Sequence, residues 1–329
     1  MRAIQIVELS GPDSALREVE IPEPDASHML SPGSGVLIDV EAAGVSFPEV
    51  LQTRGEYQVK PELPFVPGSE VAGTVRSAPE GSSLEVGQRV AGFPMLGGFA
   101  EVAVSPEFLT FPLSDTLDAR QGAALILNYH TAWFSLVTRG RLAEGETVLI
   151  HGAAGGVGTA SIQVAKGVGA KTIAVVSSDE KAAVAREAGA DEVVRSDGPW
   201  KDEAKELSGG GVDVVVDPVG GDRFTDSIRS LAEGGRVVVV GFTAGSIPEV
   251  KVNRLLLNNV EIIGAGWGAY VIPKPEFNLE VGAEVAKLVD TGVIAPVVGA
   301  SFPLADAAEA LKLIDGRGAT GKVVLDVPG

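Results

Sequence analysis

The sequence predicts an α/β protein with a doubly wound parallel sheet and a second, strand-rich domain. Three observations predict this class. Valine-rich strands alternate with helical segments from about residue 146, a glycine-rich turn joins the first of these strands to its helix, and short apolar runs split by Pro and Gly fill the N-terminal third. A chain of 329 residues has room for two domains, because single cores stop growing near about 250 residues.

The N-terminal region, residues 1–122, shows a pattern typical of a compact β barrel or sandwich. Its short apolar strands include 35–42, 70–75 and 98–104, with frequent turns between them. Residues 118–136 then become helical in composition.

Strands and helices alternate in the central region, as in a parallel sheet covered on both faces. The predicted strands are 147–151, 172–176, 192–194, 212–216, 236–240 and 260–263. The predicted helices are 159–168, 178–188, 200–208, 223–231 and 255–258. About six parallel strands therefore form this sheet.

The C-terminal region does not extend this alternating series, so we expect it to return to the first domain. Its predicted elements are a helix at 276–290, a strand at 297–302, a helix at 305–314 and a strand at 322–327. The expected boundaries are 1–122 for the first part of the catalytic domain, 123–267 for the nucleotide-binding domain and 268–329 for the return to the catalytic domain.

Composition excludes several classes of function. A net charge of −18 disfavours binding to nucleic acid or an acidic membrane. We find no signal-peptide layout and no apolar run near the ~20 residues of a membrane span, so we expect a soluble cytoplasmic protein. The chain has 0 cysteines, which excludes disulfides, a thiol nucleophile and cysteine-based zinc sites. His28, His130 and His151 are far apart in sequence, and no metal is expected.

The glycine turn at 151–158 predicts a dinucleotide site. Gly152 suits the tight turn, Gly155 leaves room for a phosphate, and Gly158 lets the next helix approach the sheet. The N-terminus of that helix offers free N–H groups to the anion. The spacing G-x-x-G-x-x-G is one residue longer than the usual dinucleotide motif, but the flanking strand and helix support the interpretation.

Residues after the second strand of the sheet favour NADPH over NADH. Ser177 stands where NAD-binding proteins usually carry a carboxylate that would repel a 2′-phosphate. Lys181 and Arg195 lie near enough to contact that phosphate. Alternatively both are solvated surface charges, and Asp179 and Glu180 would weaken a phosphate site.

Six ordered motifs resemble the medium-chain dehydrogenase/reductase superfamily, and within it the zinc-free quinone oxidoreductases related to zeta-crystallin. The motifs are 43–47, 54–57, 63–73, 87–90, 151–158 and 318–325, and the resemblance covers essentially the full chain. It implies a Rossmann nucleotide-binding domain and a discontinuous GroES-like, β-barrel-type catalytic domain.

The resemblance also implies site residues. Zinc alcohol dehydrogenases of this superfamily carry Cys and His where this chain has Ser46 and Ser69, so the metal that polarises an alcohol is missing. Tyr57, Ser46 and Thr131 would line the nicotinamide end. The family usually has Asn at the position of Ser46 and Tyr or His at that of Ser196. The implied cofactor-binding residues are Gly152, Ala154, Gly155, Gly156, Val157, Gly158, Ser177, Lys181, Ser196, Val240, Gly241, Phe242, Thr243, Ala265, Gly266, Trp267 and Arg317.

The expected reaction is hydride transfer from NADPH to a quinone or a similar conjugated carbonyl, in the cleft between the domains. One alternative is an enoyl-thioester reductase in which Tyr57 donates the proton. Another is a non-catalytic NADPH-binding protein with a structural or RNA-associated role. Residues 260–264 would form an edge strand, and pairing this edge with a second copy predicts a homodimer.

Overall fold

The computed structural model describes residues 1–328. The chain divides into two compact units. The first unit comprises Met1–Leu127, Ile272–Ala283 and Pro296–Gly329. The second comprises Asn128–Val271 and Glu284–Ala295.

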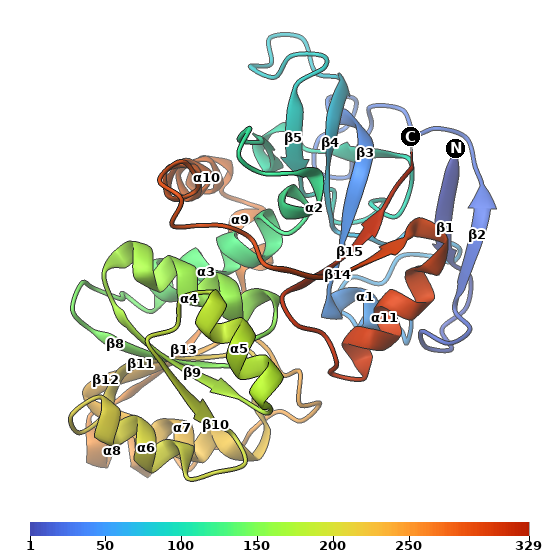
Figure 1. Ribbon diagram of the computed structural model, residues 1–329. Helices are drawn as coiled ribbons and strands as arrows, with labels where there is room; N and C mark the ends of the chain where they lie inside the picture. The colour runs from blue at the N-terminus through green and yellow to red at the C-terminus, as the bar shows by residue number, and fades with distance from the viewer. Residues whose placement is uncertain (329) are drawn as a thin grey trace. The chain divides into compact units, whose positions relative to one another are not determined.

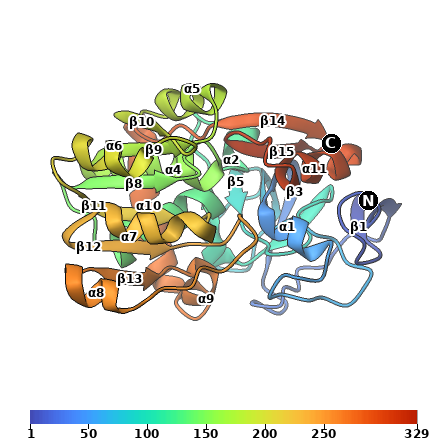
Figure 2. The ribbon, with the colours of Figure 1, turned by 90° about the horizontal axis from the view of Figure 1, so that it is seen from below.

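The first unit is built on a seven-stranded mixed sheet and a two-stranded one. The large sheet has the order β14-β15-β3-β4-β5-β7, with β6 also paired to β3, while β1 pairs with β2. The strands are β1 (Arg2–Ile6), β2 (Leu16–Glu20), β3 (Val36–Val45), β4 (Glu70–Ser77), β5 (Arg89–Gly92), β6 (Val102–Ser105), β7 (Thr110–Pro112), β14 (Val298–Pro303) and β15 (Lys322–Asp326). The C-terminal strand β15 lies beside β3, antiparallel to it (Figure 2).

The α-helices α1 (Phe47–Gln52), α2 (Ala119–Gly122) and α11 (Ala307–Asp315) also belong to the first unit. Helix α11 contacts α1, and it buries Ala307, Ala310 and Leu311 in the core of this unit. Apolar positions three and four residues apart give α11 the single buried face that such packing needs.

The second unit is a six-stranded, fully parallel sheet of order β10-β9-β8-β11-β12-β13, visible in Figure 2. The strands are β8 (Thr147–His151), β9 (Lys171–Val176), β10 (Glu192–Arg195), β11 (Val212–Asp217), β12 (Leu231–Val239) and β13 (Glu261–Gly264). The order reverses between β8 and β11, and ligands of doubly wound sheets bind outside the carboxyl ends of the strands at such a point.

Helices cover both faces of this sheet. Figure 1 shows α4 and α5 on one side of the strands and α6 and α7 on the other. The helices of this unit are α3 (Thr131–Trp133), α4 (Gly156–Val168), α5 (Asp179–Glu187), α6 (Trp200–Leu207), α7 (Phe224–Ser230), α8 (Asn253–Asn258) and α9 (Trp267–Val271). The predicted fold class, a doubly wound domain with a strand-rich partner domain, is confirmed.

The helical region predicted at 118–136 is not one regular helix. After α2 it contains a π-helical turn at Ile126–His130, the short α3 and a second π-helical segment at Phe134–Arg139. The sequence does not predict these segments, because a π-helix has about one more residue per turn than an α-helix but a similar composition.

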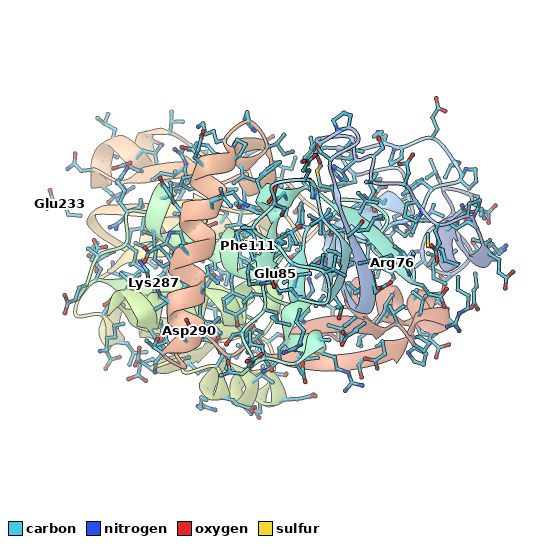
Figure 3. All side chains as sticks on the ribbon, turned by 90° about the horizontal axis from the view of Figure 1, so that it is seen from above. Arg76, Glu85, Phe111, Glu233, Lys287 and Asp290 are labelled. Carbon is cyan, nitrogen blue, oxygen red and sulfur yellow. The ribbon has the colours of Figure 1, made fainter. Side chains whose placement is uncertain are left out.

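Helix α10 (Pro275–Asp290) contributes to both units, which differs from the expected return of 268–329 as a block. Its N-terminal half packs in the first unit, where Gly282 closely approaches Phe111. Its C-terminal half, which carries Lys287 and Asp290 in Figure 3, belongs to the second unit. Leu288 packs on Gly167 of α4 there.

Candidate functional site

The glycine turn leads directly from β8 into α4. Gly152 has φ of +59°, a conformation that L side chains rarely adopt. A Cβ atom on Gly158 would overlap the carbonyl oxygen of Gly152, so only glycine permits the first turn of α4 to lie this close to the loop. Both glycines therefore fix the direction in which α4 leaves the sheet.

The start of α4 fits a pyrophosphate. Gly155 precedes the first helical residue, Gly156, and Thr159 is the first residue whose N–H bonds back to the carbonyl of Gly155. The nearest atom to a Cβ built on Gly155 is 3.4 Å away, so space remains beside this backbone. Ala154 is buried and Val157 half-buried. An anion at this position receives free donors and the positive end of the helix dipole.

Two more of the expected cofactor segments follow neighbouring strands at the same carboxyl edge. Val240, Gly241, Phe242 and Thr243 follow β12, and Ala265, Gly266 and Trp267 follow β13. The N–H of Thr243 bonds to the carbonyl of Pro218 after β11, which fixes this loop against the edge. A Cβ on Gly266 would meet nothing within 4 Å, so the backbone there is accessible to a ligand.

The expected phosphate-binding residues lie at the ends of β9 and β10. Arg195 donates hydrogen bonds to the carbonyl of Ser177 (3.0 Å) and to the carboxylate of Asp179 (2.6 Å). Ser196 is anchored through its N–H to the carbonyl of Val176. The N–H of Lys181 bonds to the hydroxyl of Ser178 in the first turn of α5, so Lys181 lies one helical turn from these groups. The structure thus places an arginine, a lysine and two serines at one corner of the sheet.

His151, the first residue of the glycine motif, is a structural residue of the core. Its ring is fully buried, its Nε2 lies 2.8 Å from the Ser227 hydroxyl, and it meets Trp200 edge-on at 4.9 Å. Burial lowers the pKa of His151 to about 4, although Asp217 acts in the opposite direction. The imidazole is therefore neutral at physiological pH.

A second group of functional side chains lies in the first unit, around the start of α1. We call Ser46, Glu49, Ser69, Glu70 and Lys322 the buried charge cluster. Glu49 is fully buried, and one of its carboxylate oxygens accepts from the N–H and hydroxyl of Ser69 at 3.0 and 2.6 Å. The other accepts from the N–H of Ser46 at 2.9 Å. Burial raises the pKa of Glu49, and the hydrogen bonds and Lys322 partly offset this rise.

Lys322 and Glu70 form a buried ion pair across the central strand of the sheet. The Nζ atom of Lys322 lies 2.7 Å from Glu70 Oε2 and 2.7 Å from Ser46 Oγ. The side chains of Lys322 and Glu70 are 2% and 0% exposed. Their strands, β15 and β4, flank β3, where Gly44 pairs with Val324 on one side and with Glu70 on the other. Because Gly44 has no side chain, Lys322 can reach over β3 to Glu70.

Tyr57 follows α1 and is half-buried. Burial raises the pKa of its phenol, and the negative charge of Glu49 raises it further. Tyr57 and Ser46 thus belong to the same part of the first unit. Of the other expected residues, Arg317 lies between α11 and β15 of this unit, whereas Thr131 is the buried first residue of α3 in the second unit.

Glu70 and Lys322 lie in the sequence motifs 63–73 and 318–325, but no role was predicted for either residue. Glu49 was not predicted as a site residue. Charged residues in otherwise apolar strands are the signal that could have identified them, since Glu and Lys are almost never fully buried unless they are paired. The pairing itself depends on strand order, which joins positions 252 residues apart.

The second unit is a doubly wound sheet with a glycine turn, and the first unit is strand-rich and built from three separate segments of the chain. These features define the class of protein, a medium-chain dehydrogenase/reductase. The family models "Alcohol dehydrogenase GroES-like domain" and "Zinc-binding dehydrogenase" match residues 32–115 and 156–281. The chain is 38% identical to the quinone oxidoreductase of Rattus norvegicus, over 99% of this chain and 97% of that protein.

Solved structures agree with this assignment. A probable oxidoreductase from Mycobacterium abscessus is 44% identical, covers 99% of each chain and superposes with a TM-score of 0.87. The quinone oxidoreductase of Thermus thermophilus, whose structure was also solved in complex with NADPH, is 33% identical, with 99% and 100% of the two chains covered and a TM-score of 0.83. The chain belongs to the quinone oxidoreductase family of the medium-chain dehydrogenases/reductases.

The name of one family model implies zinc, but the donor atoms of the buried charge cluster do not fit this metal. Zinc in proteins prefers thiolate and imidazole ligands, and the cluster offers the hydroxyls of Ser46 and Ser69. The carboxylate of Glu70 already binds an ammonium group that would repel a divalent cation. Among residues 1–328 no group of three or more His, Cys, Asp or Glu could hold a metal ion. In the same range, no helix is long and apolar enough to cross a membrane.

Proposed function

We propose that this protein is an NADPH-dependent, zinc-independent oxidoreductase that transfers hydride to a quinone or another activated conjugated carbonyl. The observation that carries the proposal is the buried charge cluster, in which Lys322 supplies a fixed positive charge where a metal-dependent relative needs a metal. A quinone is electrophilic without a metal. Hydride transfer to it therefore requires only that the nicotinamide and the quinone ring are aligned and that the quinone oxygen has a polar contact.

The corner formed by β9 and β10 supports NADPH as the reductant. Ser177 offers a hydroxyl where a carboxylate would repel the 2′-phosphate, and Lys181 and Arg195 offer positive charge. Arg195 can exchange its bond to Asp179, whose side chain is 96% exposed, for a phosphate oxygen. The complex of the Thermus thermophilus enzyme with NADPH supports the same cofactor.

Different segments of the chain have different roles in this reaction. The first turn of α4 binds the pyrophosphate, and the loops after β12 and β13 border the rest of the cofactor, which supplies a hydride when it is bound. The acceptor takes up two electrons and one hydrogen, and negative charge develops on its carbonyl oxygen until water supplies a proton. Within the first unit, Tyr57 and Ser46 border the place that we propose for the acceptor.

Tyr57 distinguishes the proposed reaction from the enoyl-thioester alternative. A tyrosine that donates a proton becomes a phenolate, and both burial and Glu49 oppose that form. These two effects make the phenol a weaker acid, and we propose that Tyr57 is an aromatic wall for a flat acceptor. The non-catalytic, RNA-associated alternative is disfavoured by the net charge of −18.

We propose further that the protein is a homodimer and is located in the cytoplasm. The edge strand β13 has no strand on its outer side in the sheet order, and Leu256 and Leu257 of the preceding helix α8 are 76% and 73% exposed. Apolar side chains beside an unpaired strand edge favour pairing with a second copy.

The test is a panel of quinones, enones and enoyl thioesters, each assayed with NADPH and with NADH. We expect the fastest turnover with quinones and NADPH. Preferential turnover of enoyl thioesters would favour the Tyr57 proton-donor alternative. Binding of NADPH without turnover of any acceptor, together with binding of single-stranded RNA, would support the non-catalytic role.

A further inference from the structure

The hydroxyl of Ser46 has a defined direction because of Lys322. An ammonium group only donates hydrogen bonds, so Ser46 Oγ must be the acceptor in its 2.7 Å contact with Lys322 Nζ. The hydrogen of the hydroxyl then points elsewhere, and within residues 1–328 Ser46 Oγ donates no hydrogen bond. Ser46 is half-buried, so this donor is available to a ligand.

The backbone of Ser46 is held as firmly as its side chain. Its N–H donates to Glu49, and Glu49 is itself fixed by two donors of Ser69. Lys322 is fixed in turn by Glu70, whose second oxygen accepts from the N–H of Leu127 at 2.9 Å. A hydroxyl held by its neighbours needs no reorganisation when charge develops beside it, which is the condition for effective stabilisation of an oxyanion.

Burial increases the influence of Lys322 on this hydroxyl. Its side chain is 2% exposed, so water screens its charge poorly. A hydroxyl that accepts from a cation becomes a stronger donor through its own hydrogen, because successive hydrogen bonds polarise one another. Glu70 neutralises the pair at longer range, and the effect of Lys322 therefore concentrates on Ser46.

We propose that the Ser46 hydroxyl donates a hydrogen bond to the carbonyl oxygen of the acceptor, and that Lys322, anchored by Glu70, is the positioning residue that orients and polarises this hydroxyl. The inference rests on the proposed hydride transfer to a conjugated carbonyl. As the hydride adds to the acceptor, the π electrons of the carbonyl move to its oxygen. Ser46 keeps its proton throughout, and water later protonates the oxygen.

Ser46→Ala and Ser46→Thr test the donor. Removal of one donor from an oxyanion site costs about 100-fold or more in well-enclosed enzymes, and removal of the hydroxyl of the half-buried Ser46 should lower kcat about 10- to 100-fold. Ser46→Thr keeps the hydroxyl and should restore most of the rate. The dissociation constant for NADPH should not change in either variant. Ser46→Ala removes one hydrogen-bond partner of the buried Lys322, so its melting temperature should fall slightly, whereas that of Ser46→Thr should not. The loss should be larger for weakly electrophilic enones than for quinones, because enones depend more on help at the oxygen.

The role of Lys322 requires a variant that still folds. Lys322→Met alone leaves Glu70 buried without its partner, so we pair it with Glu70→Gln, which removes both charges. This double variant should lower kcat about as much as Ser46→Ala, and combining all three changes should cause little further loss, because Lys322 acts through Ser46. Lys287→Met on α10 (Figure 3) removes a lysine whose side chain is 66% exposed and serves as the matched control.

Three results would overturn the inference. If the wild-type protein reduces quinones and Ser46→Ala keeps kcat within about twofold of the wild-type value, the donor role of Ser46 is wrong. The proposed function would then still hold. Losses that multiply when Ser46→Ala is combined with the Lys322 and Glu70 changes contradict the coupling, since they would show that Lys322 acts independently. Wild-type protein that binds NADPH but reduces no member of the acceptor panel removes the proposed function and this inference together.

Discussion

Gly44→Ala adds a single methyl group beside the buried charge cluster, and we expect it to destabilise the protein strongly. The added methyl group would overlap the carbonyl oxygen of Ala123, lie 2.7 Å from Lys322 Cε and lie 3.0 Å from Glu70 Oε2. A backbone carbonyl cannot move aside as a flexible side chain does. Overpacking of this kind lowers the free energy of unfolding by about 1–3 kcal/mol. Loss of a buried ion pair costs about 3–5 kcal/mol, and displacement of Lys322 from Glu70 adds part of that cost.

We therefore expect Gly44→Ala to lower the free energy of unfolding by about 3–5 kcal/mol, that is, to lower the melting temperature by roughly 6–20 °C. Calorimetry on the full chain measures the shift. Gly268→Ala is the matched control, because a Cβ at Gly268 meets nothing within 4 Å. A melting temperature for Gly44→Ala within about 2 °C of that of the control would refute the close approach of Lys322 and Glu70 over Gly44.

Three further predictions concern the acceptor, the cofactor and pH. Tyr57→Phe should keep quinone reduction within about tenfold of the wild-type rate, or roughly 1.4 kcal/mol, since an aromatic wall needs no hydroxyl; a loss of hundreds-fold in the same assay would instead favour proton donation. Lys181→Ala should weaken NADPH binding by about tenfold and leave NADH binding unchanged, as measured by fluorescence titration; equal weakening of both would show that Lys181 does not contact the 2′-phosphate. His151 binds fewer protons when folded than when unfolded between pH 4 and 6.5, so the free energy of unfolding should fall by up to about 3 kcal/mol as the pH drops through this window. His151→Gln should remove that part of the slope, and an unchanged slope in urea titrations would contradict a buried neutral imidazole.

Much of the fold could be predicted because its signals are local. The strand at 147–151 coincides with β8, and the helix at 200–208 differs from α6 by one residue. Strand β12 begins at Leu231, earlier than the predicted 236, because Glu233 and the two glycines after it form an irregular part of the strand. Local composition does not distinguish a glycine turn from a bulge when a neighbouring strand supplies the pairing.

The candidate site was predictable only in part, for the same physical reason. The glycine turn and the groups around Ser177 lie close together in sequence, and their chemistry can be inferred from spacing. The contact of Lys322 with Glu70 and Ser46 depends on the order β15-β3-β4, and its closeness depends on a missing side chain at Gly44. No periodicity in the sequence encodes that juxtaposition.

The most direct test of the central claim is the rate of NADPH oxidation by a quinone before and after removal of metal ions with a chelator, with the zinc content of the protein measured in parallel. Protein with no detectable zinc should reduce the quinone at the full rate, because Ser46, oriented by Lys322, supplies the polar contact to the acceptor. Activity that disappears with the metal and returns when zinc is added would contradict the account.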